Sequence, residues 1–498
     1  MGSNQGHKKY YRGTRTKRHG NTNKQNTNIG KFIGKVICMI QLMLTLGFSF
    51  LLWHSGLLPI KYLVIVIIAL LVLFGVTFAV QFPKGNVFIT GIVISLIISI
   101  LLGFGIYYLT SANHLLKNIT GAKYKTDNMV AVVLNEDPAQ TLEDARDYTF
   151  GINTAMDLEN TKKMIQNMEE EIGTPIKVKE YGSIQELGSA ILSQEVGAGI
   201  YNESMSGILQ ETVEGYDGAT RVLYQYGIHT EIEEEDSRDV TKPFSIFISG
   251  IDVNGPISTN SRSDVNIIMT VNPMTKKIVL TTTPRDFYVT IPGVSGEARD
   301  KLTHAGIYGV DASINTLENL YGIDIQYYAR VNFDSVVQIV DAVGGVDVES
   351  EEAFITTVGG YSIGQGNNHL DGKQALAFVR ERYNVAGGDN QRGKNQQKVI
   401  TAILKKVMSP SLLMNFNSLV ASVEGSVQTN MSHEEMQELV SSQLASGVDF
   451  QIESLAASGT GGSDICFSTG AQSLYVMYPD EGVVNDIRSH LQGVINGE

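Results

Sequence analysis

The sequence predicts an α/β protein: three N-terminal transmembrane helices, a small α/β accessory domain and a larger αβα sandwich with a central mixed sheet. Three observations predict this class. Three apolar segments near the N-terminus each have about the 20 residues that cross a bilayer. Beyond them, β-rich segments alternate with segments of helical period, which is typical of α/β domains. An acidic run at 231–244, with Pro243 near its end, divides this alternating region in two.

Residues 1–35 form a basic tail with nine Lys or Arg and no acidic residue. Because Gly, Asn, Thr and Gln lie between the charges, we expect the tail to be disordered. Such a tail could bind nucleic acid or anionic lipid weakly. We interpret it instead as a signal that keeps this end of the chain in the cytoplasm.

The apolar segments cover 36–53, 62–82 and 87–109, and none contains an acidic residue or an internal Lys or Arg. The first is the least apolar, since it is short and holds Gln41. No small-residue cleavage site follows it, so we expect membrane anchors and not a removed signal peptide. A basic tail inside and three crossings predict a multi-pass protein of the cell membrane, with everything after Thr110 extracellular.

The external part is strongly acidic. Of the 38 Lys and Arg, 11 lie in residues 1–110, which leaves 27 against 52 Asp and Glu, a net charge of −25. This excludes non-specific binding of nucleic acid by the external part. Cys38 lies in the first span and Cys466 far beyond it, which excludes a disulfide framework and a zinc site, so we expect Cys466 to be a core residue.

Two external domains are predicted, 111–238 and 239–498. In the first, strands are expected at 129–136, 176–182 and 198–204, and helices at 158–173, 184–194 and up to about 214. It carries no recognisable nucleophile, base or metal set, so we interpret it as a spacer or partner-binding domain. In the second, strands are expected at 244–252, 265–272, 277–284, 286–291, 323–332, 346–350 and 452–458, helices at 310–322, 333–345 and 431–445, and a mobile loop at 459–464.

An arginine-rich stretch, 378–397, stands out in this acidic domain, with Arg380, Arg382 and Arg392 within thirteen positions. A short helix predicted over 371–379 and a break at the following Gly pair put Arg380 and Arg382 in or near extended chain, pointing the same way. Guanidinium groups match phosphate oxygens in pairs, so one interpretation is a phosphate site. The alternative is a cluster of surface ion pairs with Glu381 and Asp389.

A long helix is predicted to follow and to run to Met408, with Asp389 or Asn390 as its N-cap. Arg392 and Gln396 lie one turn apart on it. The stripe that they begin continues in apolar residues, namely Val399, Ile400, Ile403 and Val407. This pattern predicts a polar site at the buried N-terminal end of the helix, where free N–H groups favour anions.

Aspartate and arginine recur at the ends of predicted strands. Asp252 ends the first strand of the larger domain, Arg262 and Asp264 precede the next, and Arg285 and Asp286 follow the third. Ligand crevices of open α/β sheets lie at strand ends. Asp252 and Asp264 are therefore candidates for holding Mg²⁺, with Mn²⁺ as an alternative, although each could be only a turn or cap residue.

Other catalytic patterns are weaker. His304 lies in a Gly-flanked turn, where a structural role is the favoured interpretation and general-base catalysis the alternative. The sequence contains no HExxH or GxxxxGK[ST] motif, so zinc-protease and ATPase functions lack support.

Over residues 243–410, the chain resembles the LytR-CpsA-Psr family in the content and order of several motifs. These motifs are ISGIDVNG, SRSDVNIIMTVNP, TTTPRDFYVTIPG, KLTHAGIYG, NTLENLYGI, VNFDSVVQIVDAVGGVDV, HLDGKQALAFVRERYN and GGDNQRGKNQQKVI. The three spans and the accessory domain before them resemble the capsule-type members of streptococci and their relatives.

The resemblance implies transfer of a cell-wall glycopolymer, here capsular polysaccharide, from a polyprenyl pyrophosphate carrier to peptidoglycan through a phosphodiester bond. It also implies an apolar tunnel for the lipid, and other capsule-assembly proteins as further partners. The implied pyrophosphate ligands are Arg262, Arg285, Arg380, Arg382, Arg392 and Gln396, with Asp252 and Asp264 holding the metal. Arginines and a metal would neutralise the transferred phosphate.

The general base is the least defined role, and Asp389 or Asp286 could serve by position. Two alternative functions remain at this stage. The first is a membrane-bound regulator of capsule genes, acting as transcriptional attenuator or activator through the basic tail. The second is a phosphatase that hydrolyses polyprenyl pyrophosphate, because water could replace the sugar acceptor without any change of site residue.

Overall fold

The computed structural model describes residues 19–54, 60–83, 87–119, 124–231, 238–251, 257–409, 425–470 and 472–498. The chain divides into two compact units, Met1–Ser111 and Ala112–Glu498. Asp252, the candidate metal ligand after the first strand of the larger domain, lies outside the described residues.

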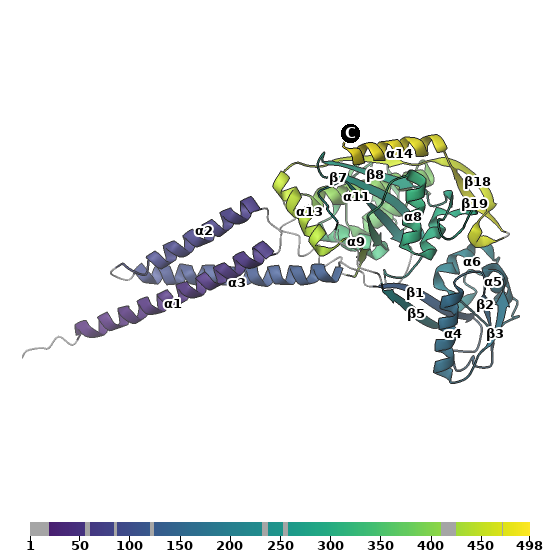
Figure 1. Cartoon of the computed structure of the whole chain (residues 1–498), viewed down its shortest axis with the longest axis horizontal. Coiled ribbons are helices and arrows are strands. Elements are labelled where there is room, and N and C mark those ends of the chain that lie inside the picture. The colour runs from purple at the N-terminus through teal and green to yellow at the C-terminus, as the bar shows by residue number, and fades with distance from the viewer. Residues whose placement is uncertain are drawn as a thin grey trace, which may run out of the picture. The chain divides into compact units, whose positions relative to one another are not determined.

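Three long helices begin in the first unit, α1 His19–His54, α2 Ile60–Ala79 and α3 Val87–Ile119, the last of which ends beyond Ser111 (Figure 1). Each contains a membrane-length apolar segment, which agrees with the three predicted spans. The buried Thr77 Oγ1 donates to Gln41 Oε1 at 3.0 Å, so the amide oxygen of the polar residue that weakened the first span is paired with a neighbouring helix. The prediction of a disordered tail is wrong from His19 onward, because a helix nucleated in an apolar span extends cheaply into polar sequence.

The second unit begins with the accessory domain, a five-stranded sheet in the order β3-β2-β4-β1-β5. Its elements are β1 Tyr124–Leu134, β2 Thr149–Asn153, α4 Leu158–Ile172, β3 Lys177–Tyr181, α5 Ile184–Leu192, β4 Ala198–Asn202, η1 Glu203–Met205, α6 Ser206–Thr212 and β5 Thr220–Glu231. Alternate residues of β1 face opposite cores: Met129 and Ala131 pack with α4, and Val130 and Val132 pack with α5 and α6. Every predicted element is present, but the sequence patterns missed β2 and β5.

The larger domain is built on a six-stranded sheet in the order β16-β11-β6-β7-β8-β17. These strands are β6 Phe244–Ile251, β7 Ser263–Asn272, β8 Lys277–Thr283, β11 Tyr327–Val331, β16 Val427–Thr429 and β17 Gln451–Ala456. β6 pairs with β11 and β8 with β17 in parallel, whereas β6–β7, β7–β8 and β11–β16 are antiparallel. The sheet is therefore mixed, as predicted.

Helices cover both faces of this sheet. They are α7 Leu302–Ala305, η2 Gly306–Tyr308, α8 Val310–Tyr321, α9 Phe333–Ala342, α10 Gly372–Arg380, α11 Gly388–Val407, α13 His433–Ser446 and α14 Glu481–Asn496. Ile268 and Val279 pack with residues of α8 and α14 on one face. Ile267 and Ile278 pack with residues of α11 and α13 on the other. This alternation along β7 and β8 produces the predicted αβα sandwich.

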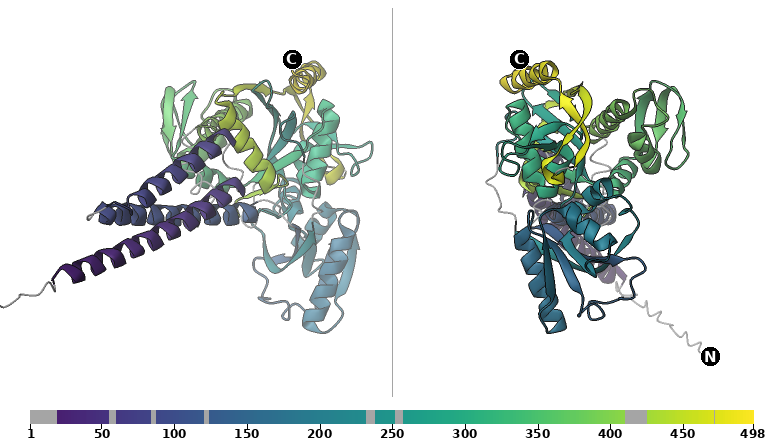
Figure 2. Two further views of the ribbon diagram at one scale, coloured as in Figure 1. Left: turned by 60° about the vertical axis from the view of Figure 1, so that its left-hand side comes forward. Right: turned by 90° about the vertical axis from the view of Figure 1, so that its right-hand side faces the viewer.

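Small hairpins complete the domain. They pair β9 Tyr288–Thr290 with β10 Arg299–Lys301, β12 Val346–Ser350 with β15 Gly366–Leu370, β13 Phe354–Ile355 with β14 Ser362–Ile363, and β18 Gly459–Ile465 with β19 Ser473–Pro479, before which lies η3 Phe467–Thr469. Both views of Figure 2 show the green hairpins around residue 360 projecting from the side of the sheet. The predicted mobile loop at 459–464 is instead strand β18. A Cβ on Gly462 would lie 2.5 Å from the Tyr478 ring, so these glycines let tyrosine rings cover the strand.

Candidate functional site

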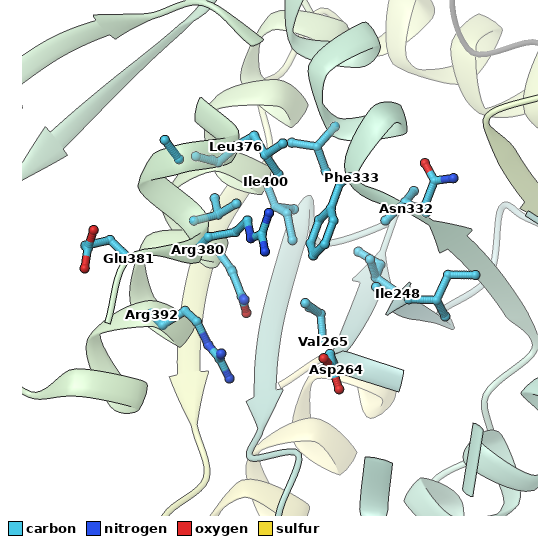
Figure 3. A pocket seen from close by; sticks show the side chains of 18 of the residues that line it. Ile248, Asp264, Val265, Asn332, Phe333, Leu376, Arg380, Glu381, Arg392 and Ile400 are labelled. Atoms are coloured by element: carbon cyan, nitrogen blue, oxygen red, sulfur yellow. The ribbon is translucent and has the colours of Figure 1, made fainter. Parts of the chain in front are cut away.

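An apolar cavity of about 510 Å³ lies between the sheet and helices α9, α10 and α11 (Figure 3). Its apolar lining includes Ile248, Val331, Val336, Ile339, Leu376, Val379, Val399, Ile400, Ile403 and Leu404. Its polar lining includes Asp264, Arg285, Arg380, Arg382, Arg392 and Gln396. One cavity thus joins a long aliphatic surface to a group of four arginines.

Asp264 and Arg285 are in direct contact at this cavity. Arg285 Nη1 lies 3.1 Å from Asp264 Oδ2, and Thr303 Oγ1 donates to Asp264 Oδ1 at 3.1 Å. Their side chains are 22% and 24% exposed, so the pair is partly withdrawn from water yet reachable from the cavity. β7 and β8 are adjacent strands, and Asp264 near the start of one therefore meets Arg285 just after the end of the other.

Arg380 is the last residue of α10, which begins at a capping box between Asp371 and Gln374. Its guanidinium carbon lies 4.1 Å from the centroid of the Phe333 ring, and Figure 3 shows the side chain turned toward that ring. Such a cation–π contact fixes the guanidinium at the cavity. Arg380, predicted in or near extended chain, ends the helix, and extended backbone begins at Glu381, because α10 runs one residue further than the pattern indicated.

Arg382 lies two residues after the end of α10. Its guanidinium carbon lies 4.6 Å from the centroid of the Tyr383 ring, and its Nη2 donates to the Tyr383 hydroxyl. Both arginines line the cavity, but each stacks on a different aromatic ring. Each of the two guanidinium groups is therefore held by its own aromatic ring.

Glu381, between the two arginines, is 2% exposed. Its carboxylate accepts the backbone N–H groups of Thr357, Arg382, Tyr383 and Asn384, and the Thr357 hydroxyl at 3.0 Å. Burial works to raise the pKa of Glu381, and the N–H groups of Thr357 and Asn384 outweigh it, so the pKa is lowered. Glu381 is therefore not part of a surface ion pair, which was the alternative interpretation. Its carboxylate joins the β13–β14 hairpin to the turn after α10 through hydrogen bonds.

Helix α11 begins at Gly388 and has Gly387 as its N-cap, with φ 90°. This left-handed conformation favours glycine, so the cap falls earlier than predicted. Asp389 is therefore in the first turn and is not the N-cap; its side chain lies outside the described residues. Arg392 and Gln396 line the cavity one turn apart, and the predicted stripe continues along it as far as Ile403.

A second cavity of about 220 Å³ adjoins the first and shares Asp264, Val265, Arg285, Arg392 and Gln396 with it. The rest of its lining is mainly polar: Asn266, Thr282, Thr283, Pro284, Asn390, Gly393, Lys394, Ala456, Ala457 and Ser458. A Cβ on Gly393 would lie 3.2 Å from Thr282 Cγ2, so this glycine lets α11 approach β8 closely. The charged residues thus lie where an apolar and a polar cavity meet.

Two of the predicted site residues lie beside these cavities. Arg262 and Asp286 are described residues that line neither of the two. Arg262 Nη1 lies 2.6 Å from Glu211 Oε1 of the accessory domain. Asp286 lies between two cations, with Oδ2 3.7 Å from Arg285 Nε and Oδ1 3.4 Å from Lys301 Nζ.

Asp264 is the candidate metal ligand that the structure describes. Among the described residues there is no group of three or more His, Cys, Asp or Glu side chains that could hold a metal ion. Mg²⁺, however, usually takes only one or two carboxylates and completes its shell with phosphate oxygens and water. A carboxylate at the meeting point of the two cavities fits that mode of binding.

His304 is fully buried, together with Asp300 and Ser468. Its Nδ1 lies 2.6 Å from Asp300 Oδ1 and 2.8 Å from Ser468 Oγ. Burial works to raise the pKa of Asp300, and the hydrogen bond and charge of His304 together with the hydrogen bonds from Ser468 outweigh it, so the pKa is lowered. The histidine lines neither cavity, which supports the structural interpretation.

Comparisons with known proteins found a family model and several similar proteins. The LytR-CpsA-Psr family model matches residues 211–487. The polyisoprenyl-teichoic acid–peptidoglycan teichoic acid transferase TagU of Bacillus cereus is 32% identical over 305 residues, which are 60% of this chain and 93% of that protein. TagU of Bacillus subtilis is 32% identical over 272 residues, 53% of this chain and 84% of that protein. The crystal structure of B. subtilis TagV aligns with a TM-score of 0.45 and 27% identity over 51% of this chain and 98% of that one.

Proposed function

Because the chain belongs to the LytR-CpsA-Psr family, we propose that it is a membrane-anchored glycopolymer transferase that moves a polymer from a polyprenyl pyrophosphate carrier to peptidoglycan. The relatives are named for transfer of teichoic acid from a polyisoprenyl carrier to peptidoglycan. The polymer proposed here is capsular polysaccharide, and the proposed place of the reaction is outside the cell. One observation carries the proposal: a single cavity joins an aliphatic surface to four arginines.

The donor occupies the apolar cavity. Burial of the polyprenyl chain against α9, α10 and α11 removes apolar surface from water, which favours binding. The pyrophosphate then lies against Arg285, Arg380, Arg382 and Arg392, with Gln396 beside them. The N-terminal end of α11, where Arg392 lies, adds free N–H groups that favour an anion.

The acceptor approaches through the polar cavity. A hydroxyl of a peptidoglycan sugar attacks the phosphorus that carries the polymer, and the bond from this phosphorus to the bridging oxygen of the pyrophosphate breaks. Polyprenyl phosphate leaves with the electron pair, and the hydroxyl proton passes to a base. Phosphoryl transfer needs the attacking and leaving oxygens roughly in line. Two cavities that meet at Asp264, Arg285 and Arg392 offer separate approaches for the two groups.

Asp389 is the proposed base. It precedes Asn390, which lines the polar cavity, in the first turn of α11. Asp286 is the weaker candidate, since it is held between Arg285 and Lys301 and lines neither cavity.

Asp264 and Asp252 are the proposed ligands of Mg²⁺, or of Mn²⁺ in its place. A bound divalent cation would supply positive charge to the phosphate oxygens as negative charge develops on them. Asp264 would be oriented for this role by Thr303 and Arg285.

A transfer assay with the full-length protein in lipid nanodiscs tests the proposal. The substrates are labelled lipid-linked polysaccharide, peptidoglycan and Mg²⁺. We expect label on peptidoglycan, and its loss in Arg380→Ala and in Asp264→Ala. As a matched control, Arg488→Ala removes an arginine of α14 whose guanidinium donates to Leu320 O, outside both cavities.

The same assay separates transfer from hydrolysis. Label that is released only into solution, with none on peptidoglycan, would show a phosphatase and contradict the proposed transferase. Equal loss of activity in Arg488→Ala and Arg380→Ala would show that the arginine group has no special role.

A further inference from the structure

The accessory domain holds the loop that leads into β7 and Asp264. Thr126 of β1 donates its N–H to Ser258 O at 3.0 Å, and its own O accepts from Asn260 N at 3.1 Å. Asn260 Nδ2 also donates to Asp127 Oδ1 at 2.8 Å. The loop at 257–262 is thus hydrogen-bonded to the start of β1 in the accessory domain, through both backbone and side-chain groups.

A second contact comes from helix α6 of the accessory domain. Gly207 and Glu211 are one turn apart and share a face of this helix. A Cβ on Gly207 would lie 2.6 Å from Arg262 Cζ, so the guanidinium lies where the helix carries no side chain. Glu211 Oε1 is 2.6 Å from Arg262 Nη1, and Glu211 Oε2 is 3.5 Å from Lys301 Nζ. One glutamate therefore joins two cations on two separate segments of the larger domain.

From Lys301, a series of ion pairs continues to the site. Lys301 Nζ lies 3.4 Å from Asp286 Oδ1, Asp286 Oδ2 lies 3.7 Å from Arg285 Nε, and Arg285 Nη1 lies 3.1 Å from Asp264 Oδ2. The backbone follows the same course, since Thr303 N donates to Arg285 O at 2.8 Å. An unbroken sequence of contacts connects the accessory domain to the residues that line both cavities.

The positive and negative charges in this series of ion pairs are equal in number. Among the described residues the series contains three cations, Arg262, Lys301 and Arg285, and three anions, Glu211, Asp286 and Asp264. The Lys301 side chain is only 8% exposed and that of Asp286 16%, so solvent screens these pairs less than surface pairs. Burial works to raise the pKa of Glu211, and Lys301 and Arg262 outweigh it, so the pKa is lowered and the carboxylate stays charged at neutral pH.

Loss of the Glu211 charge would leave three cations with two anions. Among the described residues, Lys301, nearly buried, would then keep Asp286 as its remaining ion-pair partner, and Asp286 would be drawn from Arg285. A buried charge that loses its partner reorganises its surroundings. Arg285, the last cation in this series of ion pairs, contacts Asp264, and both residues line both cavities.

We propose that Glu211 is a positioning residue for the transfer reaction: through Lys301 and Asp286 it sets the orientation of Arg285 and Asp264. This inference rests on the proposed function of the site. It gives the accessory domain a part in the reaction, in place of the spacer role that its sequence suggested.

The experiment compares full-length variants in nanodiscs. Glu211→Gln removes the charge with little change of shape, Glu211→Asp keeps the charge, and Glu214→Gln is the control, an exposed glutamate three residues further on. We expect Glu211→Gln to lower kcat for transfer roughly tenfold or more, because small displacements of a catalytic group have large effects on rate. Its thermal unfolding should match that of Glu214→Gln, and Glu211→Asp should recover most of the rate.

Two further measurements make the test decisive. If Glu211 acts through Lys301, the effects of Glu211→Gln and Lys301→Gln on kcat are not additive in the double variant. Binding of inorganic pyrophosphate is measured in parallel, and Glu211→Gln should bind it several-fold more weakly than wild type. Equal kcat and equal pyrophosphate affinity for Glu211→Gln and Glu214→Gln would overturn the inference. If wild type bound pyrophosphate but transferred nothing, the proposed function would fail, and the pyrophosphate measurement would still decide on Glu211.

Discussion

The guanidinium carbon of Arg380 lies 4.1 Å from the centroid of the Phe333 ring, across the mouth of the apolar cavity. Arg380 ends α10 and Phe333 begins α9, so the contact joins two helix termini. It holds a cation beside an aliphatic surface. A lipid pyrophosphate needs the cation for its phosphates and the aliphatic surface for its hydrocarbon chain.

Phe333→Leu should weaken binding of the lipid-linked donor by about 0.5–2 kcal/mol, since leucine keeps the apolar bulk and loses the ring face. Affinity for a fluorescent polyprenyl pyrophosphate measures the effect. Phe467→Leu is the control, because this ring is partly exposed and lines neither cavity. Equal donor affinity in the two variants would show that the ring contributes nothing to the site.

Glu381→Gln should loosen the β13–β14 hairpin and the turn after α10. Five donors converge on this carboxylate, and an amide would place N–H groups against some of them, at a cost of about 1–3 kcal/mol. Hydrogen exchange should become faster at the amides of Thr357, Tyr383 and Asn384 and stay unchanged in α14. Hydrogen-exchange protection equal to wild type at these amides would show that the Glu381 carboxylate does not hold the hairpin and the turn together.

The same carboxylate predicts a pH dependence. The pKa of Glu381 is lower in the folded protein, so its contribution to stability is complete above the unfolded value of about 4.3 and is lost as pH falls through the folded value. The gap in urea midpoint between wild type and Glu381→Gln should therefore be largest near neutral pH, begin to shrink as pH falls through the unfolded value, and close below the folded pKa. A gap that persists unchanged in acid would assign the effect to shape and not to charge.

The outline of the fold was predictable from periodicity, because Ile267 and Ile278 on one face and Ile268 and Val279 on the other alternate as a two-sided sheet requires. What periodicity missed depends on tertiary contact. Strand β18 has three glycines and reads as a loop, yet it is ordered by the tyrosines of β19. The N-cap of α11 is set by the backbone of Gly387 and not by a polar side chain.

The candidate site, like the fold, was predictable only in part. Residue type and strand ends placed Asp264, Arg285 and the arginines of 380–392 at one cavity. Phe333, Glu381 and Lys301 were missed because their roles are to hold other residues, and a supporting contact leaves no spacing pattern in the chain. The one available signal for Glu381 was its position between two arginines, which was interpreted as a surface ion pair.

Gly393→Val should impair use of the acceptor and spare binding of the donor. The new side chain would enter the polar cavity, where a Cβ alone already comes within 3.2 Å of Thr282 Cγ2. We expect a higher KM for peptidoglycan, or transfer lost altogether, with unchanged affinity for polyprenyl pyrophosphate. A variant that lost donor affinity and kept its KM for peptidoglycan would reverse the proposed assignment of the two cavities.

Ile403→Phe should shorten the apolar cavity, because Ile403 lines it two turns beyond the Gln396 end of α11. Overpacking of an apolar site costs about 1–3 kcal/mol, and only ligands that reach the blocked part should lose it. Donors with long polyprenyl chains should therefore bind the variant more weakly, and short-chain analogues should bind as in wild type. Val407→Phe, one turn further along the same helix and outside the cavity lining, is the matched control. The ratio of long-chain to short-chain affinity is the measurement. A ratio unchanged in Ile403→Phe would mean that the lipid does not run along α11, and that the aliphatic surface beside the arginines serves another ligand.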